Sequence, residues 1–257
     1  PSYRATLDEK DSTTGRANVL REFLTQNTKE NPFDHPEIKE VMDLCVSCKA
    51  CKSECPSNVD MATLKAEFLY QYQKTNPVSL RSKLIAHNAK VNLIAHRFSW
   101  IYNIIAKSKW FKKCIGVHPN RSLPILKPTT LRQWFSNHVQ GTHTKSVFLF
   151  CDEYTNYYDL DIGIKAVKLL NKLGYTVNIP NHPESARAYI SKGFLKEAKA
   201  IATENIKLFS TLISKDTPLI GIEPSAILGF RDEYPNLVNA SLKYNAKKLG
   251  LNTFTIE

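Results

Sequence analysis

The chain has 257 residues, 42% of them hydrophobic and 23% charged, values that are ordinary for a globular protein and exclude a disordered or fibrous one. This length exceeds the usual size of one domain and favours two. There is no secretory signal and no apolar run near about 18 residues, so the sequence predicts a protein without a membrane-spanning helix.

The net charge of +11 is unevenly spread: residues 68–151 carry 13 Lys and Arg and no Asp or Glu. Such a positive field can attract nucleic acid, an anionic membrane surface or an acidic protein. It can equally be a solvated basic face that only aids solubility. The chain has charge and aromatic residues but no motif that reads nucleic acid, so we expect no nucleic-acid partner.

Four of the six cysteines lie in one short run near the front of the chain. They are spaced C-x2-C-x2-C-x3-C and followed by proline, and they are Cys45, Cys48, Cys51 and Cys55. In this pattern the first three thiolates wrap one face of an iron–sulfur cube, while the fourth ligates a second cluster in two-cluster ferredoxins. The alternatives are a zinc knuckle, a disulfide pair or chance. Zinc sites usually need a second cysteine pair or histidines nearby, so we favour a 4Fe-4S ligand run.

Helices are expected on both sides of the run. Residues 17–24 form an amphipathic stretch, and residues 37–44 carry apolar side chains at helical spacing. Asp60 is placed to cap a further helix that carries apolar residues on one side. Lys49 and Lys52 stand beside the ligands, where they either favour the reduced cluster electrostatically or are ordinary exposed loop lysines.

The basic stretch continues as one or two amphipathic helices over residues 80–111. Aromatic side chains alternate there with lysines, a pattern that suits a membrane interface. More often such an apolar face packs against a neighbouring domain, which is the interpretation we prefer. Residues 116–134, with three prolines, are expected to form a linker.

From residue 145 the hydrophobic period changes. Strands are predicted at residues 147–150, 175–179, 218–222 and 253–256, and helices between them at residues 162–173, 193–213 and 237–249. This alternation predicts a mostly parallel sheet covered on both faces. No glycine-rich phosphate loop follows a strand, so a nucleotide site is not expected here.

Ligands of such sheets lie beyond the carboxyl ends of the strands. The charged residues expected there could line an anion or electron-acceptor site, or form ion pairs such as Glu184 with Arg187 and Glu223 with Arg231. We favour the ion pairs. The full set is Asp152, Glu184, Arg187, Lys192 and Glu223.

The cysteine run and several short segments together resemble the iron–sulfur part of FAD-linked oxidases of the D-lactate or D-2-hydroxyglutarate dehydrogenase type. The resemblance covers essentially the whole chain. Its segments are PSNVD at 56–60, PSYRAT at 1–6, GRAN at 15–18, RSLP at 121–124, TNY at 155–157, SKG at 191–193, EPS at 223–225 and RDEY at 231–234.

The residue patterns and the resemblance together predict an α + α/β fold in three parts. Residues 1–76 would be an all-α, ferredoxin-like 4Fe-4S region, and residues 77–143 a basic helical connector and linker. Residues 144–257 would be an α/β domain with a mostly parallel sheet. This domain is similar to the cysteine-rich domain of heterodisulfide reductase and glycerol-3-phosphate dehydrogenase subunits, but it lacks the twin-cysteine signatures. We therefore expect no cluster there and treat Cys114 and Cys151 as small buried side chains.

In the family, a cysteine typically precedes the segment at 1–6, and a flavin domain lies upstream. We expect both ends of this chain to be cut from a longer polypeptide, so that Cys45, Cys48 and Cys51 would need one ligand from outside. The resemblance implies 4Fe-4S clusters here, FAD in the upstream domain, and a quinone or carrier protein as electron acceptor. It also implies a cytoplasmic protein that can contact the inner face of the membrane. The alternative is a separate iron–sulfur subunit of a glycerol-3-phosphate dehydrogenase or heterodisulfide-reductase-like complex, which docks on a flavoprotein.

Overall fold

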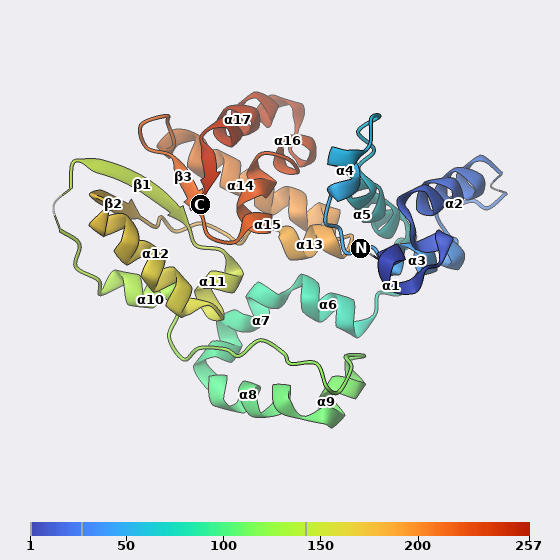
Figure 1. The fold of residues 1–257 in the computed structure, drawn as a ribbon, viewed down its shortest axis with the longest axis horizontal. Coiled ribbons are helices and arrows are strands. Elements are labelled where there is room, and N and C mark those ends of the chain that lie inside the picture. The colour runs from blue at the N-terminus through green and yellow to red at the C-terminus, as the bar shows by residue number, and fades with distance from the viewer. Residues whose placement is uncertain (1, 27, 142) are drawn as a thin grey trace. The chain divides into compact units, whose positions relative to one another are not determined.

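The computed structural model describes residues 2–26, 28–141 and 143–257. The chain divides into two compact units (Figure 1). The first consists of Pro1–Ala86 and Tyr189–Leu195, and the second of His87–Ala188 and Lys196–Glu257.

The first unit is helical. Its core joins Leu20, Ile38, Met42, Met61 and Phe68, and Cys45 and Cys51 pack against this core. Its elements are α1 Ser2–Thr6, η1 Glu9–Asp11, α2 Thr13–Thr25, α3 Pro36–Asp43, α4 Ala50–Glu54, α5 Met61–Tyr72 and α6 Leu80–Ala86.

Local sequence explains where the two helices beside the cysteines begin and end. α3 starts with Pro36 at a position where the missing N–H costs nothing, and it buries Ile38 and Met42 on one face. The carboxylate of Asp60 accepts a 3.0 Å hydrogen bond from the backbone of Thr63, which confirms the predicted cap of α5.

A glycine of the later chain is part of the first unit. Gly193 has φ of +75°, and a Cβ added there would lie 2.6 Å from the Cβ of Leu69 on α5. Only glycine fits both the left-handed backbone and this close approach. The segment 189–195 therefore packs on the α5 backbone, and the side chain of Gln73 donates to the carbonyl of Lys192 at 2.8 Å.

The second unit contains a parallel sheet of four strands in the order β2-β1-β3-β4. Register pairs include Val147 with Val177 and Leu149 with Ile220. The strands are β1 Lys145–Phe150, β2 Tyr175–Asn178, β3 Leu219–Gly221 and β4 Thr253–Thr255. The four predicted strands and their parallel arrangement are confirmed.

Helices cover both faces of this sheet, as predicted (Figure 1). Val147 and Leu149 of β1 pack with Val167 of α12 on one face. Phe150 points to the other face, where it meets Phe209 of α14 with ring centroids 6.0 Å apart. The helices from α10 onward are α10 Leu131–Ser136, α11 Glu153–Tyr157, α12 Leu160–Lys172, α13 Arg187–Ser191, α14 Leu195–Leu212, α15 Pro224–Ile227, η3 Leu228–Phe230, α16 Tyr234–Leu237 and α17 Ala240–Leu251.

The basic stretch is divided more finely than the predicted one or two helices. After α6 it continues as α7 Asn88–Ala95, η2 His96–Phe98, α8 Ser99–Lys107 and α9 Lys109–Cys114. The predicted linker over residues 116–134 has turns and irregular backbone up to Thr130. Thr130 then caps α10 through a capping box with Gln133, so the linker prediction is wrong for residues 131–134, which are helical. Within the described ranges, none of the helices has the length and apolar character needed to cross a bilayer.

The chain is thus mostly helical with one parallel sheet, as expected for an α + α/β protein. A ferredoxin-like arrangement of the first unit stays a prediction.

Candidate functional site

The cysteine run forms a loop between α3 and α5. The backbone N–H of Cys45 bonds to the carbonyl of Met42 at 3.0 Å, which extends the end of α3 into the loop. Ser47 and Lys49 then adopt left-handed backbone angles, with φ of 53° and 60°. These two reversals fold the chain tightly before α4 begins, so that the whole run stays within one short segment of the first unit.

Three of the four cysteines open on one cavity. Cys45, Cys48 and Cys51 line a hollow of about 340 Å³ in the first unit, together with the buried pair Asp11 and Arg16. The fourth cysteine of the run does not line it. That the fourth cysteine serves a different cluster from the first three stays a prediction.

Cys55 has surroundings that favour a thiolate. Hydrogen bonds from the backbone of Val59, Ser57 and Asn58 lower the pKa of its thiol, and partial desolvation opposes them. Backbone N–H groups that point at a sulfur stabilise its negative charge, whether the thiolate is free or bound to a metal.

The lysines near the run are held by specific partners. The ammonium groups of Lys49 and Lys52 lie 3.8 and 3.7 Å from the carboxylate of Asp60. Lys65 of α5 is buried and donates to the Cys45 carbonyl at 2.6 Å, and this burial lowers its pKa. The loop is therefore tied to α5 by Asp60 and Lys65, which places positive charge close to the thiols.

The donor types fit an iron–sulfur cluster, because all four cysteines of the run are free thiols in one loop. Their present arrangement is looser than a metal requires. Among residues 2–26, 28–141 and 143–257, no three His, Cys, Asp or Glu side chains converge closely enough to hold a metal ion.

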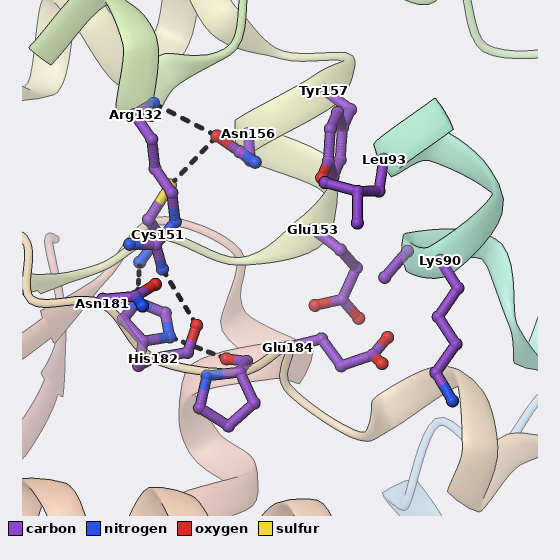
Figure 2. Close-up of a pocket in the computed structure, with 12 residues that line it drawn as sticks. Lys90, Leu93, Arg132, Cys151, Glu153, Asn156, Tyr157, Asn181, His182 and Glu184 are labelled. Atoms are coloured by element: carbon purple, nitrogen blue, oxygen red, sulfur yellow. Dashed lines mark hydrogen bonds between the residues drawn. The ribbon is translucent and has the colours of Figure 1, made fainter. Parts of the chain in front are cut away.

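A second cavity, of about 310 Å³, lies in the second unit beyond the carboxyl ends of β1 and β2 (Figure 2). Arg132 of α10 crosses it and donates to the carbonyls of Pro180 and His182 at 2.8 and 3.2 Å. Glu153 and Glu184 face the same space, and so do Lys90 and Leu93 of α7.

Burial sets the protonation states in this cavity. The Cys151 N–H donates to Nε2 of His182 at 3.1 Å, and Nδ1 lies 2.7 Å from the Pro183 carbonyl, so both ring nitrogens are engaged by a neutral imidazole. Desolvation lowers the pKa of His182 to about 3. Desolvation likewise raises the pKa of the Cys151 thiol to about 12, so this cysteine is an inert structural group.

Glu153 is buried, and desolvation raises its pKa although Ser185 donates to it through N–H and Oγ at 2.9 and 2.7 Å. Asp152 caps α11 by accepting from the backbone of Tyr154 and Thr155, both at 2.9 Å. Burial nonetheless raises the pKa of Asp152 to about 7, with the Thr155 and Tyr154 bonds opposing it. These carboxyl groups mainly hold the strand-end loops in place.

The other strand-end charges have partners beyond those expected from the sequence. Arg187 lies 3.2 Å from Glu233, and Glu223 caps α15 through Ala226 at 2.6 Å. Arg231 donates to the backbone carbonyl of Thr253 at 2.7 Å. Lys192 belongs to the first unit.

Of the two lone cysteines, Cys151 is buried as predicted, whereas Cys114 is exposed and contradicts that expectation. Sequence reasoning also missed Arg132 and His182. Arg132 lies in a segment whose prolines predict a linker, and neither residue belongs to a recognisable motif.

The geometry therefore presents a thiol-rich loop over a cavity in a helical unit, followed by a parallel α/β unit. The comparisons agree with an iron–sulfur class: residues 1–60 match the family model of the 4Fe-4S dicluster domain.

Among curated proteins, the chain is similar to D-2-hydroxyglutarate dehydrogenases from Pantoea ananatis and Haemophilus influenzae. It is 27% identical to the first over 85% of this chain and 28% identical to the second over 91%. These matches cover 23% and 27% of the relatives, so the chain spans about a quarter of their length. It is also 25% identical over 73% of its length to a subunit of the anaerobic glycerol-3-phosphate dehydrogenase of Escherichia coli, and 49% of that subunit is covered. No solved structure matches.

Proposed function

We propose that this chain is the electron-transfer portion of an FAD-dependent 2-hydroxy-acid oxidoreductase. It would carry electrons from a flavin through 4Fe-4S clusters to an acceptor, either a quinone or a carrier protein. The observation that carries the proposal is that the dicluster match at residues 1–60 contains the cysteine loop whose first three thiols open on one cavity. The similarity to two D-2-hydroxyglutarate dehydrogenases supports a 2-hydroxy acid as the substrate of the whole enzyme.

In this proposal Cys45, Cys48 and Cys51 hold one cluster, and Cys55 ligates a second. A bound cluster accepts one electron at a time, while a flavin takes up two as a hydride from the substrate. The chain itself provides thiolates, the positive charge of Lys65 and backbone N–H groups at sulfur, and these groups set the reduction potential of a cluster.

Each part of the chain would have its own role. Residues 1–76 bind the clusters, residues 77–143 form a basic connector, and residues 144–257 form the α/β domain. The partners would be a flavin domain upstream in the same polypeptide and the electron acceptor. The site of action would be the cytoplasm, at the inner face of the membrane.

The test is a two-stage electron transfer with the reconstituted chain. Chemically reduced flavin mononucleotide, mixed anaerobically, should bleach the iron–sulfur absorbance, and a soluble quinone should restore it. D-2-hydroxyglutarate or D-lactate with a dye acceptor should give no turnover, because the flavin belongs to another domain. Failure of flavin to reduce a loaded cluster, or turnover of a 2-hydroxy acid by the chain alone, would contradict the proposal.

A second candidate is a separate iron–sulfur subunit that docks on a flavoprotein. The match to half of a glycerol-3-phosphate dehydrogenase subunit favours it, since that relative is itself a separate chain of its enzyme. The size of the natural polypeptide separates the two: a flavin-binding segment fused in the same chain excludes the second candidate.

A further inference from the structure

Helix α8 has its apolar and polar sides reversed relative to an ordinary surface helix. Its inward face carries the buried Ser99 and Ala106, with Asn103 between them. The Asn103 side chain donates to the Leu126 carbonyl at 3.0 Å and accepts from the Leu126 N–H at 2.9 Å. A surface helix normally turns its apolar stripe toward the core.

The outward side of α8 is apolar. Its residues, here called the α8 face, recur at helical spacing and are Trp100, Ile101, Ile104 and Ile105, of which Trp100 is 66% and Ile104 64% exposed. Phe98 before the helix and Trp110 on α9 are also exposed. Contiguous exposed apolar surface of this kind marks a place where another surface binds.

The charge around the α8 face indicates which surface that is. Exposed cations flank it along the chain, namely Arg97, Lys107, Lys109 and Lys113. The surrounding residues 68–151 contain no Asp or Glu. Bulky apolar and indole side chains with flanking lysines are the composition of helices that lie in the headgroup region of an anionic bilayer.

We infer that the α8 face docks the second unit on an anionic lipid surface. The helix lies along the surface: its nine residues span only about 14 Å, too short to cross a bilayer. The inference rests on the proposed function for the membrane location, and it adds the surface of the chain that meets the lipid. The surface itself is argued from α8 and α9 and does not require a bound cluster.

The experiment is sedimentation of the whole chain with vesicles of phosphatidylcholine alone, or of phosphatidylcholine with phosphatidylglycerol added as the anionic lipid. The chain should bind the anionic vesicles, and binding should fall steeply as salt is raised. The double substitution Trp100→Gln and Ile104→Gln should weaken binding about tenfold per side chain. Replacing Lys107, Lys109 and Lys113 with Gln should lower the affinity for anionic vesicles about fivefold per cation.

The matched control is Tyr244→Gln with Leu251→Gln on α17, two residues that are 75% and 78% exposed in the same unit. Binding should be unchanged by this pair. Equal binding by the α8 variant and the control, or no binding to anionic vesicles, would overturn the inference. The inference would also be overturned if the α8 variant bound vesicles as the wild type does but no longer formed a dimer or a complex with the flavin domain. Iron content, measured on the same samples, tests the proposed function separately.

Discussion

The buried pair Arg16 and Asp11 offers a sharp test of how the cysteine loop is held. Arg16 Nη2 lies 3.5 Å from Asp11 Oδ1, and the two side chains are 5% and 2% exposed. Arg16 Nε also donates to the Val41 carbonyl at 2.9 Å, near the end of α3 from which the cysteine loop departs. Arg16 therefore fixes α2 to the helix that delivers Cys45.

Replacing Arg16 with Met keeps most of the side-chain volume but leaves the Asp11 carboxylate buried without its cation. Breaking a buried pair in this way costs about 3–5 kcal/mol, and the lost bond to Val41 adds about 1 kcal/mol. That is a large part of the roughly 5–15 kcal/mol that stabilises a typical domain. Adding Asp11→Asn removes the buried charge and should restore at least about 2 kcal/mol.

The assay is native-state hydrogen exchange followed by mass spectrometry, because it reports on each unit separately. Peptides from α2 and α3 should lose protection in Arg16→Met, while peptides from β1 in the second unit serve as an internal control. Two results would refute the reasoning. One is a loss of less than about 1 kcal/mol of unfolding free energy in Arg16→Met, and the other is a double variant no more stable than Arg16→Met alone.

Three further predictions follow from burial and backbone geometry. As pH drops from 6.5 to 3, the wild type should lose up to about 1.4 kcal/mol of unfolding free energy per pH unit relative to His182→Gln. The reason is that His182 binds a proton in the unfolded chain and stays neutral in the folded one. Equal pH profiles of the two proteins in urea unfolding would contradict this. At pH 8 iodoacetamide should label the exposed Cys114 and leave Cys151 unmodified until the protein is unfolded, as measured by mass spectrometry. Labelling of both cysteines in the folded protein would contradict the burial of Cys151. Gly193→Ala should lower the free energy of unfolding of the first unit by about 2–5 kcal/mol, because the added Cβ strains the left-handed backbone and clashes with Leu69. Unchanged amide hydrogen exchange in α5 would argue against that packing.

The strongly periodic parts of the fold were predictable from sequence. The apolar run of β1 and the helix that Asp60 caps were both placed correctly, since each depends on local pattern. Short helices such as α11 and α13 were not predicted, because five residues are too few to show a helical period.

The candidate site was predictable where its residues are adjacent in sequence and not where they are distant. The cysteine run shows its spacing directly. Arg132 meets His182 only because α10 packs beside the ends of β1 and β2, a contact across 50 residues that no local pattern encodes. The outward apolar face of α8 follows the same rule: its composition was visible, but only the packing of Asn103 shows which side faces inward.

The central claim is that the cysteine loop binds an iron–sulfur cluster, and metal content tests it most directly. After anaerobic reconstitution with iron and sulfide in the presence of a thiol, the chain should hold about four irons and four sulfides and give a paramagnetic resonance signal on reduction. Cys51→Ser should abolish both, and Cys114→Ser, which changes an exposed cysteine outside the loop, should alter neither. Zinc in place of iron, or an iron count unaffected by Cys51→Ser, would contradict the account.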